Sequence, residues 1–116
     1  KFVKGSVESQ GASYEFEFIR QFPPLVNDKN MADVLEKAAK KIVGDENVFE
    51  LATPSMGGED FAFYTEKVPS SFVFVGMTKD VENPILHHNA KFAWEDKNMK
   101  NLAQTLAQVA IDFLNN

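Results

Sequence analysis

The segment Ser71-Phe72-Val73-Phe74-Val75-Gly76 restricts the possible folds of this chain more than any other part of the sequence. Aromatic and β-branched residues occupy successive positions, so both faces of the segment would be apolar if it were extended. A strand with two apolar faces is typical of the interior of a sheet that helices cover on both sides. We therefore expect a buried strand here and helices elsewhere in the chain to cover it.

Two long amphipathic helices are predicted by the spacing of apolar residues. They cover residues 29–43 and 99–113, where apolar side chains recur every three or four positions. Asn27 or Asp28 can cap the first of these helices. A shorter helix is expected over residues 59–67, because a proline follows it closely.

The remaining segments predict strands and a domain boundary. Residues 13–20 alternate aromatic and charged side chains, the pattern of a half-exposed antiparallel strand, and residues 1–7 are expected to be its partner. Residues 47–51 are a further strand candidate. Pro23-Pro24 stiffens the chain and is the expected boundary. Strands and helices alternate beyond it, which favours a layered α/β domain.

Composition argues against several classes of partner. The net charge is −5, and Lys37, Lys40 and Lys41 are interpreted as one solvated helix face rather than a binding patch, so we expect no nucleic acid. The chain has no cysteine, so any metal ligands are nitrogen or oxygen, and a cytoplasmic location is expected. No apolar run reaches the length of a membrane span, so we expect no membrane partner.

One candidate site motif is Ser55-Met56-Gly57-Gly58-Glu59-Asp60-Phe61. Gly57 and Gly58 allow the backbone to approach a ligand, and Glu59 and Asp60 stand at the start of a predicted helix. Acidic residues are favourable in a first helical turn for structural reasons alone, so both a structural and a functional interpretation stand. The spacing does not match a dinucleotide-binding fingerprint or a phosphate-binding loop.

The second candidate motif, Leu86-His87-His88-Asn89-Ala90-Lys91-Phe92, holds both histidines of the chain. Neutral imidazole is a frequent metal ligand. Neighbouring side chains of an extended segment point in opposite directions, so one metal is expected to bind only one of the two rings. A catalytic zinc commonly has three protein ligands, so one histidine cannot hold it alone. The alternative interpretation is two polar loop residues at the surface.

Both motifs, with the sequence around them, resemble a known family. The matching segments are Pro23-Pro24-Leu25-Val26-Asn27-Asp28, Pro54 to Phe61, Glu66 to Gly76, and His-His-x-x-Lys-Phe before Glu95-Asp96. In this combination the chain resembles the C-terminal part of metal-dependent amidohydrolases. That family includes hippurate hydrolases, N-acyl-amino-acid amidohydrolases and indoleacetyl-amino-acid hydrolases, and it is related to dinuclear aminopeptidases and carboxypeptidases. The resemblance extends over nearly the whole chain.

The resemblance implies a domain organisation. Family members have an α/β catalytic domain with two divalent metal ions, of which Zn, Mn or Co are the candidates. A smaller α+β lid domain interrupts it and usually forms a homodimer. Residues 1–22 would be the last strand or strands of the lid, and residues 23–116 the returning half of the layered catalytic domain. The missing N-terminal part of the same protein would supply the rest.

The resemblance also implies a site. The family pattern His-x-Pro-x-Phe makes His88 the metal ligand, with His87 as the alternative, although Ala90 replaces the proline. Residues 57–60 would form a substrate-side loop. The general base and the other ligands would lie in the missing part, so this chain contains no catalytic residue, and the isolated chain is expected to be inactive.

The implied reaction is attack of a metal-activated water on the amide bond of an N-acyl amino acid or small peptide. Two other functions are kept as alternatives. One is a non-catalytic α/β binding or interaction domain. The other is a small-ligand domain that binds an anion at the Gly57-Gly58 loop.

Overall fold

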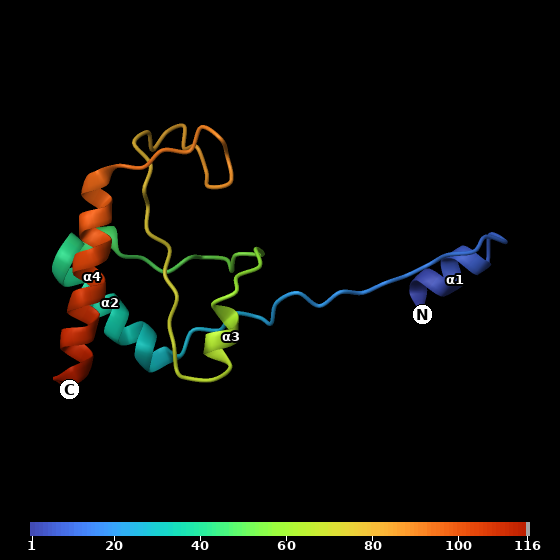
Figure 1. The fold of residues 1–116 in the computed structure, drawn as a ribbon, viewed down its shortest axis with the longest axis horizontal. Coiled ribbons are helices and arrows are strands. Elements are labelled where there is room, and N and C mark those ends of the chain that lie inside the picture. The colour runs from blue at the N-terminus through green and yellow to red at the C-terminus, as the bar shows by residue number, and fades with distance from the viewer. Residues whose placement is uncertain (116) are drawn as a thin grey trace.

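The computed structural model describes residues 1–115 and contains helices joined by long irregular segments (Figure 1). In chain order the helices are α1 (Phe2–Glu8), α2 (Lys29–Val43), the 3-10 helix η1 (Asp45–Asn47), α3 (Ala62–Thr65) and α4 (Asp96–Leu114). No strand occurs within this described part of the chain.

Helix α2 covers residues 29–43, as predicted, and both of its ends have a physical cause. Asp28 is the N-cap, and its Oδ1 accepts a hydrogen bond of 3.0 Å from the Met31 amide. At the other end Gly44 adopts a φ of 88°, and its amide donates to the Lys40 carbonyl. A side chain is rarely tolerated at that φ, so glycine ends the helix there.

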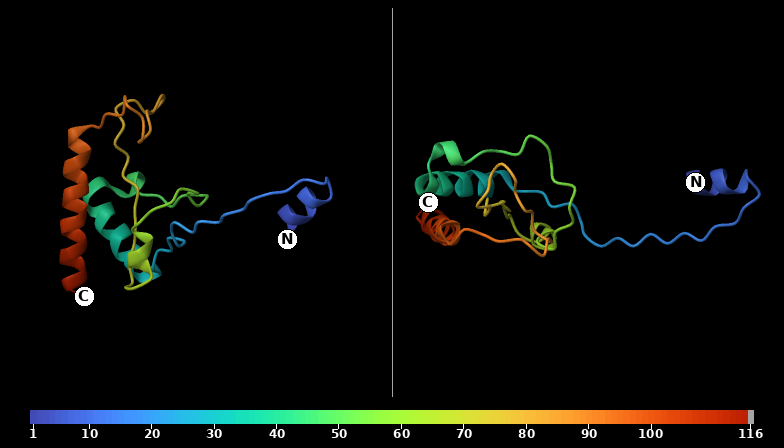
Figure 2. Two further views of the ribbon diagram at one scale, coloured as in Figure 1. Left: turned by 45° about the vertical axis from the view of Figure 1, so that its right-hand side comes forward. Right: turned by 90° about the horizontal axis from the view of Figure 1, so that it is seen from above.

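Helices α2 and α4 form the one extensive contact between elements in residues 1–115, and they lie side by side in both views of Figure 2. Ala38 on α2 is fully buried, and Thr105 on α4 is 8% exposed. Near the C-terminal ends of α2 and α4 the Lys41 ammonium lies 2.7 Å from Asp112 Oδ1, and the Gln108 side-chain amide donates to the same oxygen. Apolar burial and one ion-pair cluster thus hold this unit together.

The expected helix near residues 99–113 is confirmed, but the face that packs on α2 is not the predicted apolar stripe. Leu102 and Val109, at one edge of that stripe, are half-buried together with polar residues of the same face. Met99, Leu106 and Phe113, in its middle, are each about half exposed. Most of the apolar face of α4 is therefore uncovered in this structure.

The predicted hairpin at the N-terminus is wrong. Residues 2–8 form helix α1 instead of a strand, and residues 13–20 have no regular structure. Figure 1 shows α1 at the end of an extended segment, away from the other helices. A helix forms its hydrogen bonds between residues of one segment, whereas a strand needs a neighbouring strand to form any. Period-two alternation predicts which face would be buried but does not supply that neighbour.

The α/β fold class is likewise wrong for the described residues, including the lid strand and the interior strand over 71–76. The 47–51 segment begins in η1 and continues without regular structure. The backbone of Phe72 is bonded to a side chain rather than to a strand, since the Asn27 amide both accepts from its N–H at 2.8 Å and donates to its carbonyl at 3.0 Å. The predicted interior strand is therefore absent, because no second strand pairs with this segment in the described residues.

The short helix predicted over 59–67 is present as α3, which covers only Ala62–Thr65 between flanking turns. Phe61 stacks on Tyr64 with ring centroids 5.6 Å apart and lies 5.7 Å from Phe72. Phe72 in turn contacts Phe74 edge to face. This aromatic row connects α3 to the segment that contains Phe72, and Ala62 on α3 is fully buried.

The chain as a whole is open. Its radius of gyration is 20.1 Å, whereas a compact chain of about this length has a radius of roughly 13 Å. Its accessible surface is 10112 Å², against about 6300 Å² for a compact monomer of the same mass. Across residues 1–115, no helix has the length and hydropathy that crossing a membrane requires.

Candidate functional site

Both histidines lie on a long loop whose two ends are joined. The Glu95 amide donates to the Met77 carbonyl at 2.9 Å, and the Asn98 side chain donates to the Gly76 carbonyl at 3.1 Å. Asn98 belongs to the first turn of α4, so the helix start fixes the base of the loop. Residues 78–94 therefore project from one anchored position, and we call this segment the histidine loop.

His88 has the only positive φ of any non-glycine residue described, at 65°. For an L-residue this left-handed conformation costs roughly 1–2 kcal/mol. Such a conformation persists only where surrounding interactions impose it, and it is frequent at functional sites. The structure thus distinguishes His88 from His87 by its backbone.

The two imidazole rings lie next to each other, with centroids 4.7 Å apart and planes inclined at 66°. Residues 87–91 form turns and bends rather than an extended strand, so the expectation that the rings point in opposite directions is wrong. Both rings are exposed. Either nitrogen-bearing ring is therefore accessible to an ion or a second polypeptide segment.

A turn stabilised by Asn89 follows His88 directly. Asn89 Oδ1 accepts a hydrogen bond of 2.9 Å from the Lys91 amide, and the Asn89 carbonyl accepts one of 2.9 Å from the Phe92 amide. The Phe92 ring packs edge to face on Trp94 with centroids 6.0 Å apart. These contacts were not predicted, although an asparagine beside a predicted loop residue is a common signal of such a turn.

Gly58 in the second motif is explained by packing. A Cβ atom at this position would lie 2.8 Å from Phe22 Cδ2, which is closer than non-bonded carbon atoms approach. Gly57 has no such neighbour, because its Cβ would meet only Ser55 Oγ at 3.6 Å. Neither glycine has a positive φ. Glycine at position 58 therefore makes room for the Phe22 ring, and the loop conformation does not by itself call for glycine there.

The two carboxylates of this motif have different surroundings. Glu59 is half-buried, and its Oε1 accepts a hydrogen bond of 3.1 Å from the Phe61 amide at the start of α3. Asp60 is exposed. The Glu59 contact supports the structural interpretation of that residue. With only four residues, α3 offers no basis for the anion-binding alternative.

A metal site is not completed by the described residues. No group of three or more His, Cys, Asp or Glu side chains in residues 1–115 is arranged to hold an ion. A catalytic zinc needs about three protein ligands, and the histidine loop offers one nitrogen or two. Further ligands would therefore have to come from other polypeptide.

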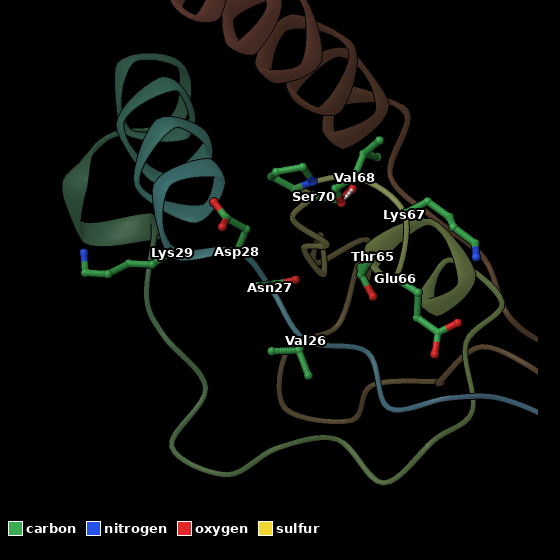
Figure 3. A pocket seen from close by; sticks show the side chains of 10 residues that line it. Val26, Asn27, Asp28, Lys29, Thr65, Glu66, Lys67, Val68 and Ser70 are labelled. Carbon is green, nitrogen blue, oxygen red and sulfur yellow. Dashed lines mark hydrogen bonds between the residues drawn. The ribbon is translucent and has the colours of Figure 1, made fainter.

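A hollow of about 540 Å³ lies between the start of α2 and the segment after α3, and no residue of the histidine loop lines it (Figure 3). Its walls are residues 26–29 and 65–70. The Asp28 amide donates to the Ser70 carbonyl at 2.8 Å, which joins the two walls beside the Asn27–Phe72 contact. The sequence predicts Asn27 only as a possible helix cap. In the structure its side chain instead joins the segment before α2 to the segment after α3 through the Phe72 backbone.

Most of the sequence matches a known protein family. The model of Peptidase family M20/M25/M40 matches residues 3–112. The protein named "Putative amidohydrolase YhaA" of Bacillus subtilis (strain 168) is 37% identical over 112 residues, which are 96% of this chain and 28% of that protein. N-acetylcysteine deacetylase of the same organism is 32% identical over 111 residues, 96% of this chain and 27% of that protein.

A plant protein shows the same similarity over a shorter stretch. IAA-amino acid hydrolase ILR1-like 4 of Arabidopsis thaliana is 41% identical over 64 residues, 55% of this chain and 14% of that protein. The chain spans about a quarter of the length of its bacterial relatives. No solved structure matches it.

Proposed function

Because the chain belongs to peptidase family M20/M25/M40, we propose that it is the C-terminal part of an amidohydrolase. The proposed substrates are N-acyl amino acids or small peptides, whose amide bond is hydrolysed to an acid and an amine. The observation that carries this proposal is the family match over residues 3–112. The names of two relatives that align with 96% of the chain support amide hydrolysis as the reaction.

We propose that residues 1–22 belong to a lid domain and residues 23–116 to the catalytic domain. The separation of α1 from the α2–α4 unit by a long extended segment supports a boundary near Pro23-Pro24 (Figure 1). The last residue, Asn116, lies outside the described residues. Homodimerisation through the lid is part of this proposal and is supported by the resemblance alone, and the proposed cytoplasmic location is supported by the absence of cysteine.

His88 is the proposed metal ligand of this chain, with His87 as the alternative. Its exposed ring and its imposed left-handed backbone support this choice. Two divalent ions, Zn, Mn or Co, would complete the site with ligands and a general base from the N-terminal part of the protein. When bound, such ions supply an acidified water for attack on an amide.

Residues 57–60 are proposed to face the substrate. Gly57 is exposed and a Cβ there would contact only Ser55 Oγ, which leaves room for a close approach, and the exposed Asp60 can contact a polar group of the substrate. We assign no proton transfer to Glu59 or Asp60: Glu59 is engaged by the Phe61 amide, and the resemblance places the general base in the N-terminal part of the protein. The role of this chain is therefore to present one ligand and one binding loop.

The proposal is tested in the full-length protein with His88→Ala and His87→Ala. We expect His88→Ala to abolish metal-dependent hydrolysis of a panel of N-acyl amino acids and to lower the content of bound metal. His87→Ala should retain clearly more activity. Metal content is measured together with turnover, and circular dichroism measures whether each variant is folded. Loss of the bound ion can then be distinguished from loss of the fold. Near-native activity of both variants would exclude the assignment.

A further inference from the structure

The histidine loop has polar contacts with the rest of the chain only at its base. Within residues 1–115, every hydrogen bond and ion pair of residues 80–94 joins them to one another or to Thr78. Residues 79–91 are all exposed, and the loop projects beyond the start of α4 (Figure 1). The position of the loop therefore depends on the contacts at its base.

Two segments, residues 76–79 and 95–98, meet at this base, and we call them the clasp. The Glu95 amide and the Asn98 side chain donate to the successive carbonyls of residues 77 and 76. The Glu95 carboxylate also lies 3.4 Å from the Lys79 ammonium, but an ion pair with a partner this exposed contributes little. The two hydrogen bonds are therefore the main polar contacts that hold the clasp closed.

The two arms of the loop have hydrogen bonds of their own. Asp80 Oδ1 accepts bonds of 3.0 Å from the amides of Glu82 and Asn83. In the other arm the Asn89 carbonyl accepts a bond of 2.9 Å from the Phe92 amide. None of these bonds crosses the clasp. Both turns can therefore stay formed while the clasp opens.

The backbone on each side of the clasp is suited to a hinge. Gly76 is exposed, and a Cβ atom there would have no atom within 4 Å, so rotation of the backbone meets no obstacle. On the other side Glu95 has an extended backbone directly before the first residue of α4. Hinges are commonly a few residues in loops or at the ends of elements.

We propose that the histidine loop opens and closes as one unit on the clasp, and that the Asn98 side chain holds it closed. Opening displaces His87 and His88 together, because both lie on the loop between the two hinges. This inference goes beyond the proposed function and requires no metal ligand. It assigns a role to Asn98, which is on α4 and outside both sequence motifs.

The experiment uses the full-length protein with Asn98→Ala and Asn98→Asp. Both variants remove the donor to the carbonyl of residue 76. Aspartate is favourable in the first turn of a helix, so the second variant loses the clasp bond without weakening the start of α4. Asn101→Ala is the matched control, since Asn101 lies one turn further along α4 and its side chain has no hydrogen bond within residues 1–115.

Amide hydrogen exchange is measured at single-residue resolution, and circular dichroism reports whether each variant is folded. The Glu95 amide reports the clasp, because it donates across it. We expect its exchange to become about two- to tenfold faster in both Asn98 variants, the effect of losing one hydrogen bond. The Glu82 and Lys91 amides report the two arms and should keep their exchange rates. Asn101→Ala should change none of the three.

Three results would overturn the inference. Unchanged exchange at Glu95 in both Asn98 variants would show that this side chain does not hold the clasp. An equal acceleration at Glu82 and Lys91 would show that the loop unfolds instead of moving as one unit. The same acceleration at Glu95 in Asn101→Ala would assign the effect to fraying of α4. The proposed function is decided separately by metal content and turnover in His88→Ala, so either proposal can fail alone.

Discussion

Gly58 lies against the ring of Phe22, and this contact makes a prediction at the scale of one residue. In Gly58→Ala the new Cβ would lie 2.8 Å from Phe22 Cδ2, so the ring or the loop must move. Overpacking of this kind costs about 1–3 kcal/mol, and the partial exposure of Phe22 favours the lower value. Urea unfolding of the full-length protein measures the change.

Gly57→Ala is the matched control, because its Cβ meets only an ordinary contact with Ser55 Oγ. We expect it to change stability by less than Gly58→Ala does. If Gly58→Ala instead keeps full stability and loses only activity, then Gly58 is required by substrate and our packing explanation is incorrect.

At the scale of single residues, the sequence indicated which residues could cap a helix, but it did not indicate which residues contact one another. Asp28 was one of two predicted helix caps and is the cap observed. The contact between Gly58 and Phe22 and the contact between Asn27 and Phe72 join residues far apart in sequence, and no local pattern encodes such contacts. The adjacent rings of His87 and His88 were not foreseen either, because the prediction assumed an extended backbone.

Between elements, the ion pair of Lys41 and Asp112 joins α2 to α4 and predicts a pH dependence. The hydrogen bonds from Lys41 and then Gln108 lower the pKa of Asp112 below its usual value of 3.8. A carboxylate whose pKa is lower in the folded state stabilises that state at neutral pH, and this contribution is lost as the pH falls through the folded-state pKa. The charged pair should therefore matter at pH 7 and not in strong acid.

We expect Asp112→Asn to lower the melting temperature of the full-length protein at pH 7. The difference from the unsubstituted protein should shrink as the pH is lowered below about 4, where the carboxylate becomes protonated. Thermal melts from pH 7 to pH 2.5 measure it. Glu50→Gln, which removes a charge from an exposed irregular segment, controls for net charge. An Asp112→Asn difference that grows in acid would have the wrong sign for this explanation.

The two long helices were predictable from local pattern, whereas helix α1 was predicted as a strand and the predicted strands are absent from the described residues. The hydrogen bonds of α2 and α4 lie mostly within each helix, so apolar spacing and capping residues were sufficient to locate both. Residues 71–76 were predicted as an interior strand from their composition, and this prediction is wrong for the described residues, because a strand needs a partner strand that the local pattern does not supply. In the described residues the Asn27 side chain forms hydrogen bonds with the backbone N–H and carbonyl of Phe72, where a neighbouring strand was expected to bond.

For the whole molecule, the main observation is uncovered apolar surface. Within residues 1–115, only Ala38 and Ala62 are buried apolar residues, and no large side chain is fully buried. Apolar patches larger than a few hundred Å² are rare on monomeric proteins and mark contacts with other polypeptide. Alternation of patterns suggested a covered sheet with an ordinary core, whereas the described chain buries too little surface to form one. A core is a property of all the segments that meet in it, and a local pattern reports only one of them.

This surface predicts how the 116-residue polypeptide behaves when it is produced alone. We expect it to self-associate, to bind a hydrophobic dye and to melt without a cooperative transition, because exposed apolar side chains on α4 have no cover. Sedimentation velocity and calorimetry measure these properties. Leu106→Lys, in the uncovered stripe, should reduce association, whereas Leu102→Lys, on the half-buried edge toward α2, should disrupt the helix pair instead. A monomer with a cooperative melt would show that the open shape does not represent the chain in solution, and the proposed requirement for additional polypeptide at the site would lose its structural support.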